Sequence, residues 1–349
     1  MTTLSWLRDW RKTFVLWAAG AVVLVIIPQV FRSNDYITLL ICYMGYYVIL
    51  ATGMNLAMGY GGQFNLAIGA IFGVGAYTTA ISMLHGYNFP VALLLSMALS
   101  TLVSLLIGLP SLRVRSHYLA LVTLGLGQAL TLIFTNWEAV TGGDVGLFNI
   151  PSASLGPLTF PDNFHMAYLI LGTMFVMLGI AAIFVRSRFG RNLRAVRDDH
   201  IAASTSGINV GVYRLVCFGL SGFYAGIAGS LYVVLVGYIN PGTFDLSQSI
   251  FILAQVLIGG LGTLSGPVVG VIVLVGLREI LLPFSEWQYI VYGAMIAFIV
   301  LVARGGVVGG ALALWKRLLR WQSTKQLELD ADKVVAISDL RDEKKVGNR

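Results

Sequence analysis

Long apolar runs joined by short polar connections dominate the first 303 residues of the chain. A run of about 17–25 apolar residues is long enough to cross the hydrocarbon core of a bilayer as a helix. The pattern predicts spans near 14–30, 36–58, 64–84, 90–109, 117–134, 166–185, 215–236, 250–264, 266–283 and 288–303. We therefore expect an all-α, polytopic membrane protein of about ten transmembrane helices.

Glycines interrupt two of these stretches. The eighth and ninth runs are separated only by a glycine-rich segment at 259–266, so they are either two spans or one broken or re-entrant element. A weak repeat also aligns the glycine-rich segment at 59–66 with the segment at 237–246. With ten spans the two copies face opposite sides of the membrane, as inverted repeats of transporters do; the alternative is chance similarity.

The placement of charged residues supports a membrane protein and separates a charge-poor region from a charged C-terminal segment. Charged residues make up 11% of the sequence, against about 25% in an ordinary soluble domain, which argues against a soluble fold. We expect a transmembrane domain at 1–303. Residues 304–349 carry 16 of the charges, and they predict a basic amphipathic helix at the membrane interface followed by a flexible cytoplasmic tail.

Lysine and arginine gather on one side of the expected topology. If the N-terminus is cytoplasmic, 11 of the 13 cations before Arg304 lie on the cytoplasmic side. The same arrangement places outside a set of acidic residues: Asp35, Glu138, Asp144, Asp162, Asp245 and Glu286. We therefore expect both termini in the cytoplasm.

The largest inner loop, at 186–214, contains the sequence FGRNLRAVRDDHIAASTSGIN at 189–209. It predicts a short helix that ends at Gly207, with an apolar stripe and with Arg194, Arg197 and Asp198 solvated. Such a helix fits a groove on a partner protein; the alternative is a basic loop that only fixes orientation.

Glycines in the apolar runs indicate close packing between helices, and amide side chains there are candidates for the lining of a translocation path. Pairs of glycines four residues apart, at 69 and 73, 222 and 226, and 266 and 270, predict close helix packing. We expect the translocation path between the glycine-rich elements at 59–75 and 242–262. Five uncharged side chains are candidates either for its lining or for hydrogen bonds between helices: Asn55, Gln63, Asn65, Gln128 and Gln255.

Motifs of catalysis and nucleotide binding are absent from the sequence. It has no phosphate-binding loop, no His-Glu-x-x-His and no Gly-x-Ser-x-Gly, and its four histidines lack metal-ligand spacing. We therefore expect no catalytic residue, no metal and no directly bound cofactor, so any ATP would be used by another chain. Only Arg278 and Glu279 approach a buried ionisable pair, which weighs against an ion-coupled secondary carrier.

Four long blocks, at 59–80, 118–147, 189–209 and 237–270, resemble the permease family of branched-chain amino acid ABC importers, in its LivM-type subunit. The resemblance implies a non-enzymatic subunit in the bacterial inner membrane. It also implies partners: a second homologous permease subunit, two cytoplasmic ATP-binding subunits and a periplasmic solute-binding protein, with no nucleic acid.

The resemblance assigns the 189–209 segment to contact with the ATPase. Its candidate coupling residues are Gly190, Arg191, Arg194, Arg197, Asp198, Asp199 and Gly207. The implied solutes are branched-chain or related amino acids. Because Phe64-Asn65-Leu66 stands where many members have a serine-leucine-glycine-like run, urea, short amides and aromatic acids stay as alternatives.

Overall fold

A computed structural model describes residues 25–32, 34–112, 116–155, 158–160 and 162–281, with residues 20 and 293. The expected C-terminal helix and tail at 304–349, and Glu286, lie outside these residues. So do the expected spans at 14–30 and 288–303, except for residues 20, 25–30 and 293.

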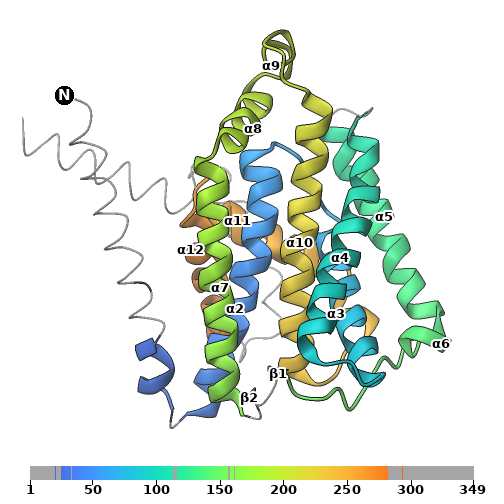
Figure 1. The fold of residues 1–349 in the computed structure, drawn as a ribbon, viewed down its shortest axis with the longest axis vertical. Coiled ribbons are helices and arrows are strands. Elements are labelled where there is room, and N and C mark those ends of the chain that lie inside the picture. The colour runs from blue at the N-terminus through green and yellow to red at the C-terminus, as the bar shows by residue number, and fades with distance from the viewer. Residues whose placement is uncertain are drawn as a thin grey trace, which may run out of the picture.

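Helices form nearly all of the described structure, as expected (Figure 1). In chain order they are α2 (Asp35–Asn55), the π-helical turn η1 (Leu56–Tyr60), α3 (Ile68–Leu84), α4 (Phe89–Gly108), the 3-10 turn η2 (Leu109–Leu112), α5 (Ser116–Asn136), α6 (Glu138–Thr141), α7 (Asn163–Arg186), α8 (Arg188–Asp198), α9 (His200–Thr205), α10 (Val210–Val236), the 3-10 turn η3 (Pro241–Phe244), α11 (Leu246–Gly259) and α12 (Gly266–Leu281). A hairpin of two short strands, β1 (Ser154–Leu155) and β2 (Leu158–Thr159), lies in the loop between α6 and α7.

The long helices run side by side, and short elements close the two ends. In Figure 1, α8 and α9 project from one end, whereas α6, β1 and β2 lie at the other. Within the described residues, six segments are long and apolar enough to cross a membrane: Asp35–Tyr60, Phe89–Leu112, Tyr118–Asn136, Asn163–Arg186, Val210–Val236 and Pro241–Gly259. The fold is that of an all-α polytopic membrane protein.

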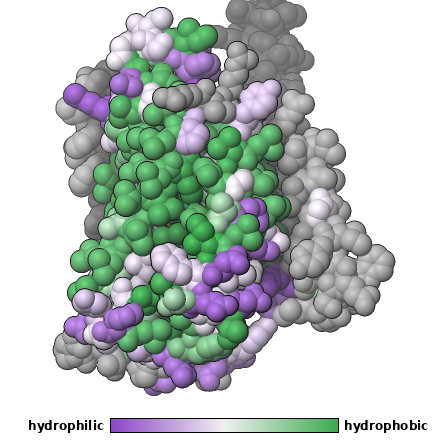
Figure 2. Space-filling view, turned by 90° about the vertical axis from the view of Figure 1, so that its right-hand side faces the viewer, coloured by the Kyte–Doolittle hydropathy of each residue, from purple (hydrophilic) through white to green (hydrophobic). Residues whose placement is uncertain are grey.

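The surface has the distribution that a bilayer requires. On the side where α4 and α5 lie, a broad hydrophobic band separates hydrophilic ends (Figure 2). Leu94 and Leu102 on α4 and Leu121 and Leu132 on α5 are more than half exposed. Large apolar side chains open to the surroundings of a helical bundle are stable in lipid, where water does not solvate them.

Helix α10 is the centre of the bundle and packs on α2, α3 and α4. Ser96 on α4 donates one hydroxyl hydrogen to two backbone oxygens, of Gly226 (2.9 Å) and of Gly75 on α3 (3.0 Å). Ser104 on α4 likewise bonds the Phe218 carbonyl at 2.6 Å. The expected glycine seam at 222 and 226 is thus confirmed: small residues let backbones approach closely where lipid supplies no hydrophobic attraction between helices.

Helical structure is interrupted at two glycine-containing segments. α2 passes into the π-helical turn η1 and an irregular segment at 61–67, so α3 begins at Ile68 and not at the expected residue 64. We call 56–67 the first break. The physical reason is local: Gly62 has φ +65°, and the Asn65 side chain accepts the Ala67 N–H at 3.2 Å, which favours a turn over a helix.

The second interruption follows α10. That helix ends at Gly237 with φ +71°, and the chain continues through η3 to Asp245, whose side chain caps α11; we call 237–245 the second break. The expected runs at 250–264 and 266–283 are two helices, α11 and α12. Gly260 (φ +118°) and Gly262 (φ +71°) form the turn between them, a conformation that favours glycine.

We expect Gly226→Leu to destabilise the bundle. A Cβ at position 226 would lie 2.8 Å from the Ser96 carbonyl oxygen and 3.1 Å from Met97 Cα, and neither backbone atom moves freely. Overpacking of this kind costs about 1–3 kcal/mol. Thermal unfolding of the purified protein in detergent should show a lower midpoint. Gly172→Leu on α7 is the control, because a Cβ there meets nothing within 4 Å; equal midpoints for the two variants would contradict the seam.

Candidate coupling segment and translocation path

The coupling segment, α8 and α9, is built by two capped turns. Ser187 accepts the Gly190 N–H at 3.3 Å and starts α8. Asp199 ends that helix and starts α9 by accepting the N–H groups of Ile201 (2.8 Å) and Ala202 (3.1 Å). Hydrogen bonds from Ala202 and Ile201 also lower the pKa of the Asp199 carboxyl below its usual value. The expected single helix is therefore two.

Gly207 lies where the sequence analysis placed the stop. It follows α9 with φ +79°, and its N–H donates to the Ser204 carbonyl at 3.1 Å. The apolar stripe is also present, because Leu193, Val196 and Ala203 are all buried. The outer face carries Arg191 and Ile201, whose side chain is 65% exposed.

Of the two arginines expected to be solvated, Arg197 is exposed, whereas Arg194 is less so. Arg194 is half-buried and donates to the carbonyls of Val185 (3.0 Å) and Gly190 (3.3 Å), which fixes α8 against the end of α7. Arg197 donates to the Gly59 carbonyl at 2.6 Å and to Asp198. Hydropathy alone does not reveal these contacts, because two of the partners, the Val185 and Gly59 carbonyls, lie at the ends of α7 and η1, where a helix leaves its carbonyls free.

Asn55 joins the end of α2 to the turn between α11 and α12. Its Nδ2 donates to the Thr263 carbonyl at 2.8 Å, and its Oδ1 accepts the Gly262 N–H at 2.9 Å. Both groups of the amide are thus used, and only 2% of the residue is exposed. In this conformation Asn55 connects helices and does not face an open path.

Gln63 and Asn65 are also engaged inside the protein. Asn65 is fully buried and donates to the Ser221 hydroxyl on α10 at 3.3 Å. Gln63 donates to the Gly61 carbonyl at 3.3 Å. The Asn65 contact corresponds to the interhelical alternative, whereas the Gln63 contact is local to the first break. Gln255 is equally buried, between α11 and α12, but its amide has no hydrogen-bond partner in the described structure.

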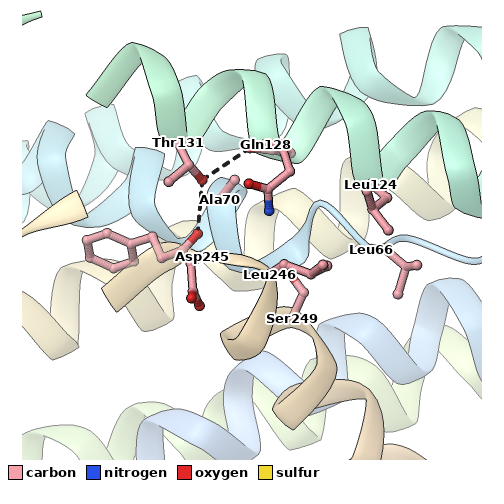
Figure 3. Close-up of a pocket in the computed structure, with 10 residues that line it drawn as sticks. Leu66, Ala70, Leu124, Gln128, Thr131, Asp245, Leu246 and Ser249 are labelled. Atoms are coloured by element: carbon pink, nitrogen blue, oxygen red, sulfur yellow. Dashed lines mark hydrogen bonds between the residues drawn. The ribbon is translucent and has the colours of Figure 1, made fainter. Parts of the chain in front are cut away.

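Gln128 has a different environment, a pocket where α5 faces both breaks (Figure 3). The pocket is lined by Leu66, Ala70, Leu124, Gly127, Gln128, Thr131, Phe244, Asp245, Leu246 and Ser249. It combines an amide, two hydroxyls and one carboxylate with leucine side chains. Of the five path candidates, only Gln128 lines it.

Side chains of α5 and α11 hold the walls of this pocket. Thr123 on α5 accepts the Leu66 N–H of the first break at 3.1 Å. One turn beyond Gln128, Thr131 donates to the Phe244 carbonyl of the second break at 3.3 Å (Figure 3). Ser249 accepts the Gly69 N–H at 3.0 Å, so the first turns of α3 and α11 meet here.

Thr131, Asp245 and Ser249 were not among the residues expected to line the path. A signal for Asp245 was nevertheless present: the repeat aligns Asn65-Leu66 with Asp245-Leu246, and Leu66 and Leu246 both line the pocket. Threonine and serine in apolar helices commonly bond their own backbone, so their type alone does not mark them. The described residues contain no cluster of three or more histidine, cysteine or acidic residues suited to a metal.

The second break is tied to the loop between α6 and α7, at the end opposite to α8. Leu147 and Ile239 exchange two backbone hydrogen bonds, of 2.9 and 3.1 Å, and Ile150 donates to the Gly237 carbonyl at 3.3 Å. Phe148 stacks on Tyr238 with ring centroids 4.7 Å apart. Each break is therefore held by a surface segment of its own.

Comparison with known proteins agrees with this architecture. Residues 36–300 match the family described as branched-chain amino acid transport system, permease component. The LivM permease proteins of the high-affinity branched-chain amino acid transport systems of Salmonella typhimurium and Escherichia coli K12 are each 30% identical over 279 residues, or 73% of this chain. The match spans 66% of those relatives' length.

A more distant similarity covers more of the chain. The autoinducer 2 import system permease protein LsrC of Enterobacter sp. is 26% identical over 309 residues, which is 86% of this chain and 87% of the relative. Both sets of relatives are transport permeases, and together with the apolar helices they identify a multi-pass membrane protein. The chain belongs to the family of permease components of branched-chain amino acid transport systems.

Proposed function

We propose that this chain is the membrane-spanning permease subunit of an ABC importer that translocates branched-chain or related amino acids. The observation that carries the proposal is the convergence of both breaks on one pocket beside α5. Interrupted backbone is tolerated at membrane depth only where it is buried in protein or lines a cavity that admits water. A path for a polar solute is such a cavity.

The pocket chemistry favours a zwitterion with an apolar side chain. Gln128, Thr131 and Ser249 offer uncharged hydrogen-bonding groups, and Leu66 and Leu246 offer apolar surface. The one carboxylate of the lining, Asp245, caps α11, and the neutral polar groups can stabilise a passing solute without trapping it by fixed charge. The names of the LivM relatives support the same class of solute. Urea, short amides and aromatic acids are the competing solutes, and an ion-coupled carrier is the competing mechanism.

The rest of the proposal concerns assembly and topology. The chain would pair with a second homologous permease subunit, two cytoplasmic ATP-binding subunits and a periplasmic solute-binding protein in a bacterial inner membrane. Ten spans, two inverted halves and cytoplasmic termini follow from the charge bias and the repeat. We infer that the coupling segment contacts the ATPase, supported by its position at one end of the helical bundle (Figure 1).

Reconstitution tests the function directly. We expect proteoliposomes that contain the assembled complex and the solute-binding protein to accumulate leucine, isoleucine or valine when ATP is enclosed with the ATP-binding subunits. Uptake should stop without ATP. Uptake by this chain alone under a proton or sodium gradient would instead support a secondary carrier, and selective uptake of urea or amides would replace the proposed solute.

Ile201 tests the docking of the coupling segment. We expect Ile201→Asp to weaken binding of the ATP-binding subunit about 10–100-fold, because burial of an isoleucine contributes about 1.5–3 kcal/mol. Ile201→Val is the control, since it keeps the apolar contact. Binding can be measured with purified chains in detergent. Equal affinity for both variants would contradict contact at the exposed face of α9.

Gln128 tests the position of the path. We expect Gln128→Cys to be labelled by a small, charged, water-soluble thiol reagent in the assembled complex, at a rate that changes with ATP. The two native thiols, Cys42 and Cys217, are fully buried, so the background should be low. Leu99→Cys on α4 is the control: it is 42% exposed on the apolar face, where lipid excludes the reagent. An active complex with no labelling at 128 in any state would contradict this path.

A further inference from the structure

Arg197 touches both glycine-rich elements that the sequence separates by about two hundred residues. Its Nη1 donates to the Gly59 carbonyl in η1 at 2.6 Å. The same nitrogen lies 3.2 Å from where a Cβ of Gly262 would be. Gly59, one residue from the end of η1, has a carbonyl of the kind that a helix end leaves free, and a guanidinium is a strong donor to it.

The two elements are already bound to one another at this point. Asn55 uses both groups of its amide on the 262–263 backbone, at 2.8 and 2.9 Å. Gly59 and Gly262 approach so closely that a side chain at residue 59 would collide with the backbone of Gly262. We call Arg197, Gly59, Asn55, Gly262 and Thr263 the junction.

Two features fix the guanidinium in the junction. Asp198 accepts from Nε at 2.9 Å and from Nη2 at 2.8 Å, which leaves Nη1 directed at Gly59. The aliphatic part of Arg197 packs on Gly62, where an added Cβ would lie 2.8 Å from Cγ. Arg197 and Asp198 keep 37% and 66% of their side chains exposed, so the pair is at the surface that a cytoplasmic partner would reach.

We propose that Arg197 is the positioning residue that transmits movement of the coupling segment to the first break and to the turn between α11 and α12. This inference rests on the proposed function, since it takes α8 and α9 as the ATPase contact. A shift of α8 carries the guanidinium with it, and the guanidinium is bonded to η1. Because Asn55 binds η1 to the 262–263 backbone, the first break and the turn between α11 and α12 move together, without any contact between the ATPase and either one.

The first test separates transport from ATP hydrolysis. In the assembled complex we expect Arg197→Ala to lower solute uptake per ATP hydrolysed by about tenfold or more, within the range of known coupling effects. Binding of the ATP-binding subunit should stay within about threefold of the wild-type value, because rim charges contribute little to affinity. Arg197→Lys should fall between, because an ammonium lacks the planar fork that reaches Asp198 and Gly59 together.

Arg188→Ala is the matched control on the same helix. That arginine is exposed and its side chain makes no hydrogen bond or ion pair with any described residue, so coupling should be unchanged. Combining Arg197→Ala with Asn55→Ala should be no worse than the more severe single variant, because both act through one linkage. Arg197→Ala with the wild-type uptake per ATP would overturn the junction. So would a double variant whose fold-loss of uptake per ATP equals the product of the two single fold-losses.

The second test needs no partner chain. In the purified protein we expect Arg197→Ala to speed amide hydrogen exchange by about fivefold or more in peptides covering 56–63 and 259–265, because local opening of both segments becomes easier. Unchanged exchange in either segment would overturn the junction. If Arg197→Ala speeds exchange in both segments but the wild-type chain binds no ATP-binding subunit, the junction is supported. The proposed function alone is then contradicted.

Discussion

Every interruption of a helix inside a bilayer leaves backbone groups that lipid cannot satisfy, and this constraint organises the molecule. The first break uses the Thr123 hydroxyl for the Leu66 N–H and the Arg197 guanidinium for the Gly59 carbonyl. Asn55 supplies both an acceptor and a donor to the 262–263 turn. The breaks are consequently placed against specific helices, and the pocket residues lie where α5 meets the first turns of α3 and α11.

The same requirement explains why small residues lie where α10 meets α3 and α4. Lipid tails are as apolar as leucine, so helices in a membrane associate through packing and hydrogen bonds. Ser96 bonds the backbones of α3 and α10 at once, and the Thr79 and Ser230 hydroxyls lie 2.6 Å apart between the same helices. Glycine on α10 makes these short approaches possible.

Hydropathy predicted the helices well and the site only in part, for a physical reason. Apolar runs report transfer into lipid, so the spans of α2, α4, α5, α7 and α10 could be read directly from the sequence. The breaks were marked by glycine, but their partners lie far away: Asn55 bonds a residue 208 positions further along the chain. Gln128 was found because an amide in an apolar run is rare. Asp245 was not, although it occupies the place of Asn65 in the repeat.

The two breaks differ in how they are held, and this difference suits alternating access. The first is bonded through Arg197 to the coupling segment, at one end of the bundle. The second is bonded through Ile239 and Gly237 to the loop between α6 and α7, at the opposite end. A path that opens to one side at a time requires that its two constrictions respond to different signals. Surface segments at opposite ends, each bonded to the backbone of one break, supply that separation, while the pocket between the breaks belongs to both.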